Sequence, residues 1–362
     1  MTTGSDTVAS RAGIALRLPP RRSPILLGAA GVVGLVVALL AGVGFGSVAV
    51  APGDTLGILA HRLFGLDIAQ TWPATAETIV WDLRLPRVFE AMIVGLGLSV
   101  AGATFQGLLR NPLADPYVLG TASGAALGAA IAVLIPVRIV ILEFGLLQGL
   151  AFLGALGAVV AVYRLARVGG GAPMTSLLLT GYALGSLLAA GLAMAMYLSG
   201  AALRQIFAYL LGSFESASWG RLAGVVPIVL VASAVIVLRA RSLNGLLLGE
   251  EAAVHLGVDV RRERALLLGF ATLITAACVA VSGLIGFVGL VVPHVVRLVV
   301  GPSARLVLPL SALAGAALLA FADIVARAAG EIPVGIVTAL IGAPFFIWLL
   351  RRSRMVRPVV TQ

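Results

Sequence analysis

Long apolar stretches recur along the chain and are separated by short polar breaks. A helix that crosses the hydrocarbon core of a bilayer needs about 20 mostly apolar residues. The pattern therefore predicts an all-α polytopic membrane protein with about ten transmembrane helices. The expected spans are residues 25–50, 88–108, 117–135, 146–166, 176–198, 222–238, 265–281, 285–300, 306–324 and 332–350.

Composition agrees with a membrane protein. Hydrophobic residues make up 60% of the 362 residues and charged residues only 11%, whereas about 25% of a soluble domain is charged. Every basic residue is an arginine, so the chain has no P-loop lysine and no lysine for a Schiff base. Any ATP chemistry is therefore expected in another chain, with ATP and Mg bound there and no cofactor in this one. The arginines form no patch interleaved with aromatics, so the net charge of +10 does not predict nucleic-acid binding.

The distribution of arginines predicts the orientation in the membrane. With the N-terminus inside, most arginines fall on the cytoplasmic side, as the positive-inside rule requires. We expect a cytoplasmic tail over residues 1–24, one transmembrane domain over 25–352 and a second cytoplasmic tail over 353–362. The expected location is a bacterial cytoplasmic (inner) membrane, with both termini in the cytoplasm.

The sequence shows no catalytic constellation. His61, His255 and His294 lie in three separate segments, and the single cysteine, Cys278, sits in an apolar run. A metal or acid–base site needs several such side chains together. We expect neither a catalytic nor a metal site, a buried thiol at Cys278, and a packing or hydrogen-bonding role for His294.

Five ordered motifs carry a resemblance to a known family. Residues 83–87 read Leu-Arg-Leu-Pro-Arg, residues 106–116 contain Arg-Asn-Pro-Leu-Ala-Asp-Pro, and residues 248–258 begin Leu-Gly-Glu-Glu-Ala. Residues 286–294 read Gly-Phe-Val-Gly-Leu-Val-Val-Pro-His, and residues 331–346 begin Glu-Ile-Pro-Val-Gly. These stretches resemble the FecCD family of ABC importer permeases, which carry iron chelates and vitamin B12, over residues 80–352.

The resemblance implies a type II importer fold and an assembly. It implies a homodimeric pore with a second copy of this chain, two ATPase subunits inside, and a periplasmic or lipoprotein substrate-binding protein outside. Membrane lipid would surround the pore, and a metal chelate would be the substrate.

Three arginines are docking candidates by resemblance. Arg84, Arg87 and Arg327 would receive acidic residues from the two lobes of the binding protein. Arginine suits this role because its planar fork binds carboxylates bidentately. Interfacial snorkelling is the alternative for Arg84 and Arg87, and a pair with Asp323 one turn earlier competes for Arg327.

A gate and a coupling segment are the other sites that the resemblance implies. Two prolines at membrane depth between residues 110 and 116 suit a pore constriction, although a helix-breaking turn with Asp115 as a cap is the alternative. The coupling segment near 244–262 contains a short predicted helix that Gly257 ends. The implied cytoplasmic gate is Asn111, Leu113, Thr175 and Ser176, and the implied ATPase coupling residues are Gly249, Glu250, Glu251, Ala252, Ala253, Leu256 and Gly257.

Two questions of function stay open at the level of sequence. An iron(III) chelate, either a siderophore or haem, is the expected substrate, and cobalamin is the alternative. An ion-coupled secondary transporter is the alternative from another class, since Glu90 lies within a predicted span and an intramembrane carboxylate is a candidate functional group. We expect Glu90 to pair with Arg87, three residues earlier. A membrane enzyme is the weakest possibility, given the dispersed histidines.

Overall fold

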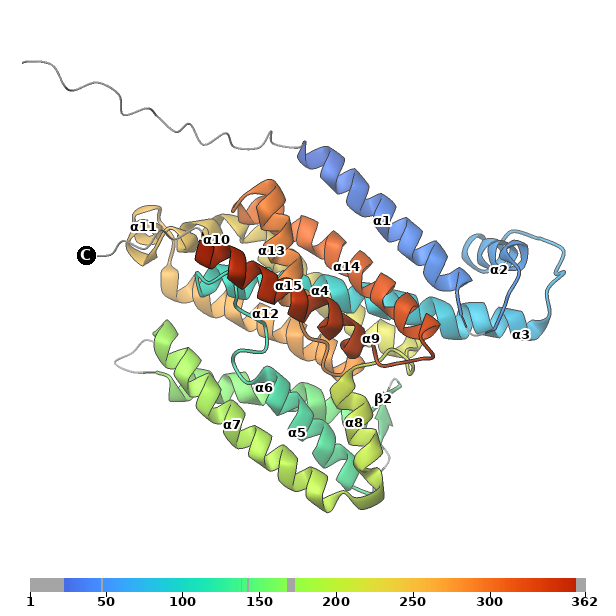
Figure 1. The fold of residues 1–362 in the computed structure, drawn as a ribbon, viewed down its shortest axis with the longest axis horizontal. Coiled ribbons are helices and arrows are strands. Elements are labelled where there is room, and N and C mark those ends of the chain that lie inside the picture. Colours follow the sequence, from blue (N-terminus) through green and yellow to red (C-terminus); the bar gives the residue numbers. More distant parts are fainter. Residues whose placement is uncertain (1–22, 47, 138, 142, 168–172, 356–362) are drawn as a thin grey trace, which may run out of the picture.

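The computed structural model describes residues 23–46, 48–137, 139–141, 143–167 and 173–355, and these residues are mostly helical (Figure 1). One antiparallel pair of two-residue strands, β1 (Val140–Ile141) and β2 (Phe144–Gly145), interrupts the helices. The helices are α1 (Pro24–Gly44), α2 (Pro52–Phe64), α3 (Ala74–Glu77), the π-helix η1 (Thr78–Arg84), α4 (Leu85–Leu108), α5 (Thr121–Leu134), α6 (Leu146–Leu165), α7 (Met174–Leu198), the 3₁₀-helix η2 (Gly200–Ala202), α8 (Leu203–Leu211), α9 (Trp219–Leu238), α10 (Ala240–Leu247), α11 (Glu250–His255), α12 (Val260–Ser282), α13 (Val288–Val300), α14 (Ala304–Ala328) and α15 (Val334–Met355).

The all-α polytopic membrane fold is confirmed. In the described part of the chain, seven helices are long and apolar enough to cross a membrane, and four further apolar helices are shorter. Three of the ten expected spans coincide with the short helices α5, α13 and α15. The fourth short apolar helix, formed by η2 and α8, was not expected from the sequence. The fold class therefore stands, while the count of ten spans is not confirmed by helix length.

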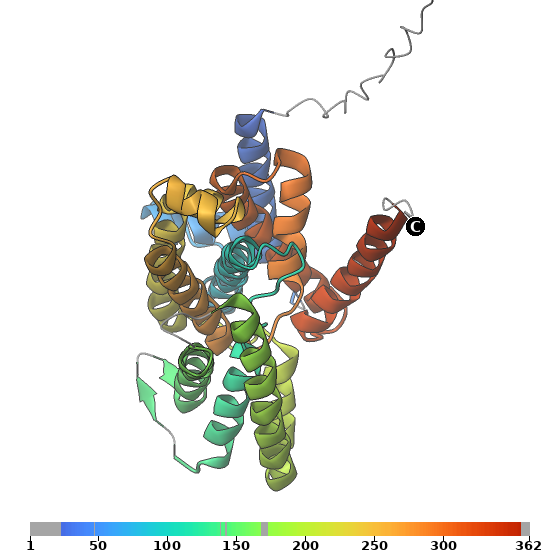
Figure 2. The ribbon, with the colours of Figure 1, turned by 90° about the vertical axis from the view of Figure 1, so that its left-hand side faces the viewer.

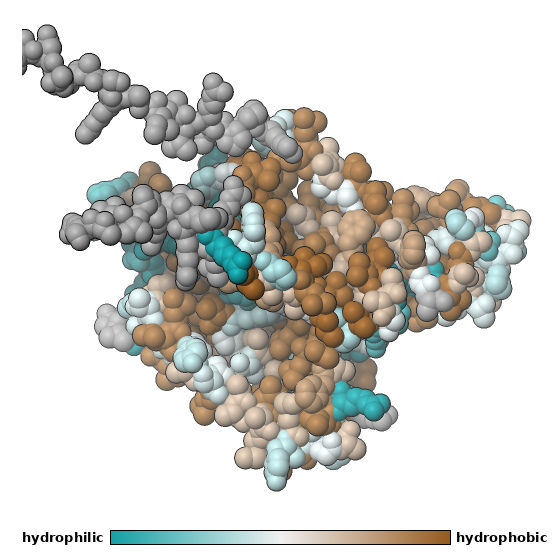
Figure 3. Space-filling model, in the orientation of Figure 1, coloured by the Kyte–Doolittle hydropathy of each residue, from teal (hydrophilic) through white to brown (hydrophobic). Residues whose placement is uncertain are grey.

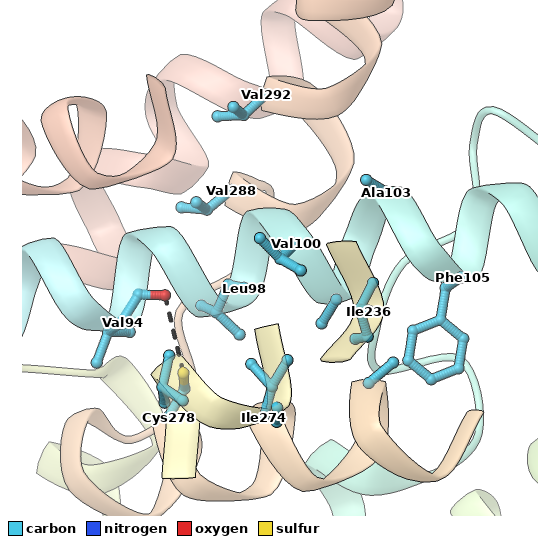
Figure 4. Packing of buried hydrophobic residues seen from close by; sticks show 14 of the residues in the cluster. Val94, Leu98, Val100, Ala103, Phe105, Ile236, Ile274, Cys278, Val288 and Val292 are labelled. Carbon is cyan, nitrogen blue, oxygen red and sulfur yellow. Dashed lines mark hydrogen bonds between the residues drawn. The ribbon is translucent and has the colours of Figure 1, made fainter. Parts of the chain in front are cut away.

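Helix α4 forms the centre of the molecule. It packs against α14, α12, α13 and α9, and most of its residues are buried. Figure 4 shows Val94, Leu98 and Val100 of α4 among side chains of the neighbouring helices. The Cys278 thiol on α12 lies 3.8 Å from the Val94 carbonyl oxygen and is fully buried, which confirms the structural interpretation of this cysteine.

Glycines allow the backbones around α4 to approach closely. A Cβ at Gly102 would lie 1.8 Å from the carbonyl oxygen of Gly289 on α13. A Cβ at Gly95 would lie 2.2 Å from the carbonyl oxygen of Gly315 on α14. Real side chains never come so near, so small residues at these crossings bring the helices together without an apolar driving force.

The second expected span begins earlier than its apolar run predicts. The helix is continuous from Ala74 through η1 to Leu108 and spans 35 residues, so the expected start at residue 88 is wrong. Pro86 is typical of a first helical turn because it donates no backbone hydrogen bond. Here the π-helical turn of η1 directly precedes it, and such wide turns interrupt the regular ladder within a helix. Arg84 and Arg87 consequently lie inside a helix rather than at its beginning.

The two ends of the molecule differ in character. Helices α10 and α11 lie at one end, and α2 and α3 lie at the opposite end (Figure 1).

Helices α5 to α8 form a separate layer below α4. Within this layer, a Cβ at Gly124 of α5 would lie 2.3 Å from the carbonyl oxygen of Gly154 of α6. Hydrophobic residues cover most of the face in Figure 3, with polar residues more frequent towards α11 and α2. Figure 2 shows α15 standing apart from the central helices.

Candidate functional site

Arg84, directly before α4, forms hydrogen bonds with the end of α1. Its side chain is 5% exposed, and its Nη1 donates to the carbonyl oxygens of Val43 at 3.0 Å and Gly44 at 3.3 Å. Its Nη2 donates to the carbonyl oxygen of Val48. The last carbonyls of a helix have no intrahelical donor and carry a partial negative charge. The guanidinium of Arg84 therefore donates hydrogen bonds to free carbonyl groups at the C-terminus of α1.

Arg87 and Arg327 share one buried carboxylate. The Nε of Arg87 lies 3.0 Å from Oδ1 and 3.2 Å from Oδ2 of Asp323, and its Nη1 lies 2.9 Å from Oε2 of Glu331. The Nε of Arg327 lies 3.1 Å from the same Asp323, which is the expected pair one turn apart. Arg327 also donates from Nη1 to the carbonyl oxygen of Phe45 at 2.7 Å, just after α1. The network joins α1, α4 and α14.

The three arginines expected to dock a binding protein are thus brought together, and each has an intramolecular partner. Only one ion pair in this network has an accessible acid, since the side chain of Glu331 is 37% exposed and that of Arg87 12% exposed. Docking by Arg84, Arg87 and Arg327 stays a prediction. A carboxylate arriving from outside would have to replace an existing contact, and the contact with Glu331 is the most accessible.

Glu90 does not pair with Arg87, contrary to expectation. The residue is 0% exposed, and neither carboxylate oxygen has a hydrogen-bond partner among the described residues. The guanidinium of Arg87 is directed to Asp323 and Glu331 instead. A burial this complete leaves Glu90 as an unpaired polar group in the core.

The coupling segment forms the helix that its sequence predicts. Helix α11 covers Glu250–His255, and Gly249 and Gly257 flank it with φ of +117° and +77°. These left-handed conformations favour glycine. Ala253 is fully buried and packs near Gly245 of α10, whereas the large side chain of Leu256 is 64% exposed. Glu250 and Glu251 are exposed, and Ala252 is half-buried.

A groove lies beside this helix. It has a volume of about 490 Å³ between α10, the end of α11 and the start of α12. Gly257, Asp259 and Arg262 line it, together with Arg241 and Glu263. The groove combines both signs of charge with open access, which suits contact with another protein surface more than capture of a small apolar ligand.

The two segments of the expected gate lie together. Asn111 accepts a hydrogen bond from the backbone N–H of Leu113 at 3.0 Å, which forms a tight turn. Leu109, just before this turn, lines a small apolar hollow with Met174, the residue before Thr175 and Ser176. Thr175 is exposed and Ser176 half-buried. Gate function itself stays a prediction.

The remaining polar candidates have local roles. Asp115 accepts from the backbone N–H of Tyr117 at 2.8 Å, so it stabilises a turn, and α5 begins only at Thr121. The ring of His294 packs against Phe345 with centroids 6.5 Å apart, and its nitrogens have no hydrogen-bond partner among the residues described. Within the same residues, no three of His, Cys, Asp and Glu are grouped to hold a metal.

Sequence reasoning missed Arg264. Its guanidinium forms an ion pair with Glu250 of the coupling helix, and the residue lines the hollow beside Leu109 and Met174. Neither contact has a sequence signal, since Arg264 is one of several arginines at the start of an amphipathic helix. Only the fold brings these segments to one place.

Comparison with known proteins shows extensive similarity. Over 301 residues the chain is 48% identical to the cobalamin import system permease protein BtuC of Halobacterium salinarum, covering 83% of this chain and 79% of that protein. It is 40% identical over 309 residues to the hemin transport system permease protein HmuU of Yersinia pestis, covering 83% and 92%. A solved inward-facing structure of a metal-chelate type ABC transporter has a TM-score of 0.78 at 30% identity, covering 91% of this chain and 100% of that one.

The family model agrees with these relatives. The model of the FecCD transport family matches residues 34–352, which is nearly the whole described chain. The chain therefore belongs to the FecCD transport family and is a permease subunit of an ABC importer.

Proposed function

We propose that this permease carries an iron(III) chelate, a siderophore or haem, inward across a bacterial inner membrane. Two partner ATPases bind ATP and Mg, a binding protein delivers the substrate from outside, and this chain binds no cofactor. In this proposal both termini and α11 face the cytoplasm. The observation that carries ATP-driven import is the placement of α11 and the arginine network at opposite ends of the buried helix α4. Similarity to a hemin permease and to a metal-chelate type transporter supports the chelate as substrate.

The surface of α11 supports an ATPase partner. Val254 is 60% exposed and Leu256 64% exposed, beside the acidic Glu250 and Glu251. Two large aliphatic side chains on an exposed short helix favour burial against another protein. The adjoining groove of about 490 Å³ adds to the surface that such a partner could contact. Movement of the ATPase dimer would then be transmitted through α11.

The accessible ion pair of Arg87 supports binding-protein docking. An incoming carboxylate would compete with Glu331 for the guanidinium. Removal of Arg87 and removal of Glu331 should therefore shift the affinity for the binding protein in opposite directions. Arg87→Gln should weaken docking, and Glu331→Gln should strengthen it, in a binding assay at low ionic strength where exposed charges are least screened. Equal affinities for both variants would contradict the role of Arg87.

A second copy of the chain would complete the pore. Only 11% of the apolar window of α7 is buried, with Leu179, Tyr182 and Leu187 exposed. Leu340 and Ile341 of α15 are 69% and 51% exposed. Two subunits related by a twofold axis would bring such faces together around the pore. Crosslinking of single cysteines on α7 in native membranes would test this arrangement.

Cobalamin is the second candidate substrate. The specific observation in its favour is the 48% identity to a cobalamin import permease, against 40% to a hemin permease. Uptake of radiolabelled iron–siderophore, haem and cobalamin by cells that express the chain with its ATPase and binding protein separates these possibilities. Accumulation of iron–siderophore or haem supports the proposal, accumulation of cobalamin alone transfers it to the second candidate, and accumulation of none contradicts both.

A further inference from the structure

The first turn of α11 contacts the part of the chain that leads into the expected gate. Arg110, which follows Leu109, places its Nη1 3.7 Å from the position of a Cβ on Gly249. Arg110 itself has φ of +47°, an unusual backbone for a residue with a side chain. The separation of 3.7 Å is an ordinary van der Waals distance, so the guanidinium of Arg110 lies beside the start of the coupling helix.

Arg264 makes a second contact to the same turn. Its Nη2 donates to Oε1 of Glu250, and their side chains are 19% and 55% exposed. The Nε of Arg264 is buried and has no hydrogen-bond partner among the described residues. Glu250 is therefore the one carboxylate that balances this cation in the described structure. A partly buried cation follows its counterion, because separation would leave it unpaired.

The same side chain also reaches the gate segments. Arg264 lines the small apolar hollow between Leu109, which directly follows α4, and Met174 of α7. Leu109 is two residues before Asn111, and Met174 directly precedes Thr175. One arginine on α12 therefore touches the coupling helix with its charged end and lies against both gate segments.

We infer that Arg264 is a positioning residue that transmits displacement of α11 to the gate. When the ATPases move α11, Glu250 draws the guanidinium of Arg264, and the change in the hollow shifts Leu109 and Met174 relative to each other. The guanidinium of Arg110 lies beside the same turn, close to Gly249. The inference rests on the proposed function, because it takes α11 as the ATPase contact and the segments at Asn111 and Thr175 as the gate.

The test uses the full complex of permease, ATPase and binding protein in proteoliposomes. Transport and ATP hydrolysis are measured in the same vesicles, and a Ser176→Cys reporter is labelled from the cytoplasmic side with and without ATP. The native Cys278 is fully buried and does not compete for the reagent. The test variants are Arg264→Gln and Arg264→Lys. The matched control is Arg305→Gln, which removes an exposed arginine at the same end of the molecule but outside the coupling segment.

We expect Arg264→Gln to hydrolyse ATP while transport per ATP falls about fivefold or more, the lower range of coupling between sites. Labelling of Ser176→Cys should depend on ATP in the parent and in Arg305→Gln, and lose that dependence in Arg264→Gln. Arg264→Lys should retain part of it. Exchange of the charges, with Glu250→Arg and Arg264→Glu together, should restore part of the coupling lost in Arg264→Gln.

Three results would overturn the inference. If Arg264→Gln transports and labels like Arg305→Gln, Arg264 does not transmit movement, and the proposed function remains. If the parent complex hydrolyses ATP but neither transports nor changes its labelling, the proposed function fails and this inference fails with it. A variant that loses only assembly with the ATPase, judged by co-purification, also contradicts transmission and assigns Arg264 to holding α11 in place.

Discussion

Arg87 on α4 and Asp323 on α14 lie 236 residues apart in the sequence, and the Nε of Arg87 is 3.0 and 3.2 Å from the two carboxylate oxygens. The side chain of Asp323 is 1% exposed, and it also pairs with Arg327. Two guanidiniums therefore depend on one buried carboxylate. This arrangement fixes α14 against the N-terminal end of α4 and places Arg87 where Glu331 can share it.

Asp323→Asn should destabilise the protein strongly. Removal of one member of a buried ion pair leaves its partners uncompensated and typically costs about 3–5 kcal/mol. Glu331→Gln is the control, because its ion pair is accessible and such pairs contribute about 0–1 kcal/mol. Thermal unfolding in detergent measures the difference. Equal melting temperatures for the two variants would show that the network does not stabilise the fold.

Glu90→Met should stabilise the protein without loss of transport. The carboxylate is fully buried with no hydrogen-bond partner among the described residues, and burial of an unpaired polar group costs about 1–3 kcal/mol. Methionine has a similar volume and no polar oxygen. The melting temperature and substrate uptake of the variant test this directly. Raised stability with abolished uptake would instead assign Glu90 a role in transport and favour ion coupling.

Gly102→Ala should prevent correct packing of α4 and α13. The new Cβ would lie 1.8 Å from the Gly289 carbonyl oxygen, so one backbone must move. Gly157→Ala on α6 is the matched control, since nothing lies within 4 Å of its Cβ position and alanine favours helix. Expression of folded protein by fluorescence-detected size-exclusion chromatography separates the two. Normal behaviour of Gly102→Ala would contradict the close crossing.

Gly249→Ala tests the start of the coupling helix. Glycine there has φ of +117°, and alanine at such an angle is strained by about 1–3 kcal/mol. The strain would displace α11 and lower ATPase association, while the membrane helices stay folded. Co-purification of the ATPase with the variant measures the effect. Undiminished association would mean that the conformation of Gly249 has no part in coupling.

Apolar runs and helix-ending residues predicted much of this structure. The hydropathy pattern was sufficient for the all-α membrane fold, and Gly257 marked the end of α11 because glycine adopts its backbone angle easily. The start of the second span was misplaced because the apolar run begins only at residue 88, whereas the helix already runs through the more polar residues of η1. Short helices such as α5, with 14 residues, carry the same apolar signal as a full span.

The pair of Arg327 with Asp323 was expected from helix spacing, but the partners of other charged side chains could not be predicted. Arg84 satisfies carbonyls at the end of α1, and Arg264 reaches Glu250 across a turn, because the fold brings these segments together. Proximity in sequence suggested instead that Glu90 pairs with Arg87. Helix spacing indicates which residues can share a face, but the neighbouring helices decide which charges meet. The expected tail over residues 1–24 lies almost entirely outside the described residues, as do residues 356–362 of the second tail.

The most direct test of ATP-driven import through α11 is uptake into proteoliposomes that contain the permease and its ATPase, with binding protein and chelate outside. Gly257 has φ of +77° with nothing within 4 Å of its Cβ position, so Gly257→Asn should be tolerated and the β-branched Gly257→Val should not. We predict uptake that requires enclosed ATP, persists in Gly257→Asn and is lost in Gly257→Val. Uptake driven by an ion gradient without ATP, unchanged in Gly257→Val, would contradict the account.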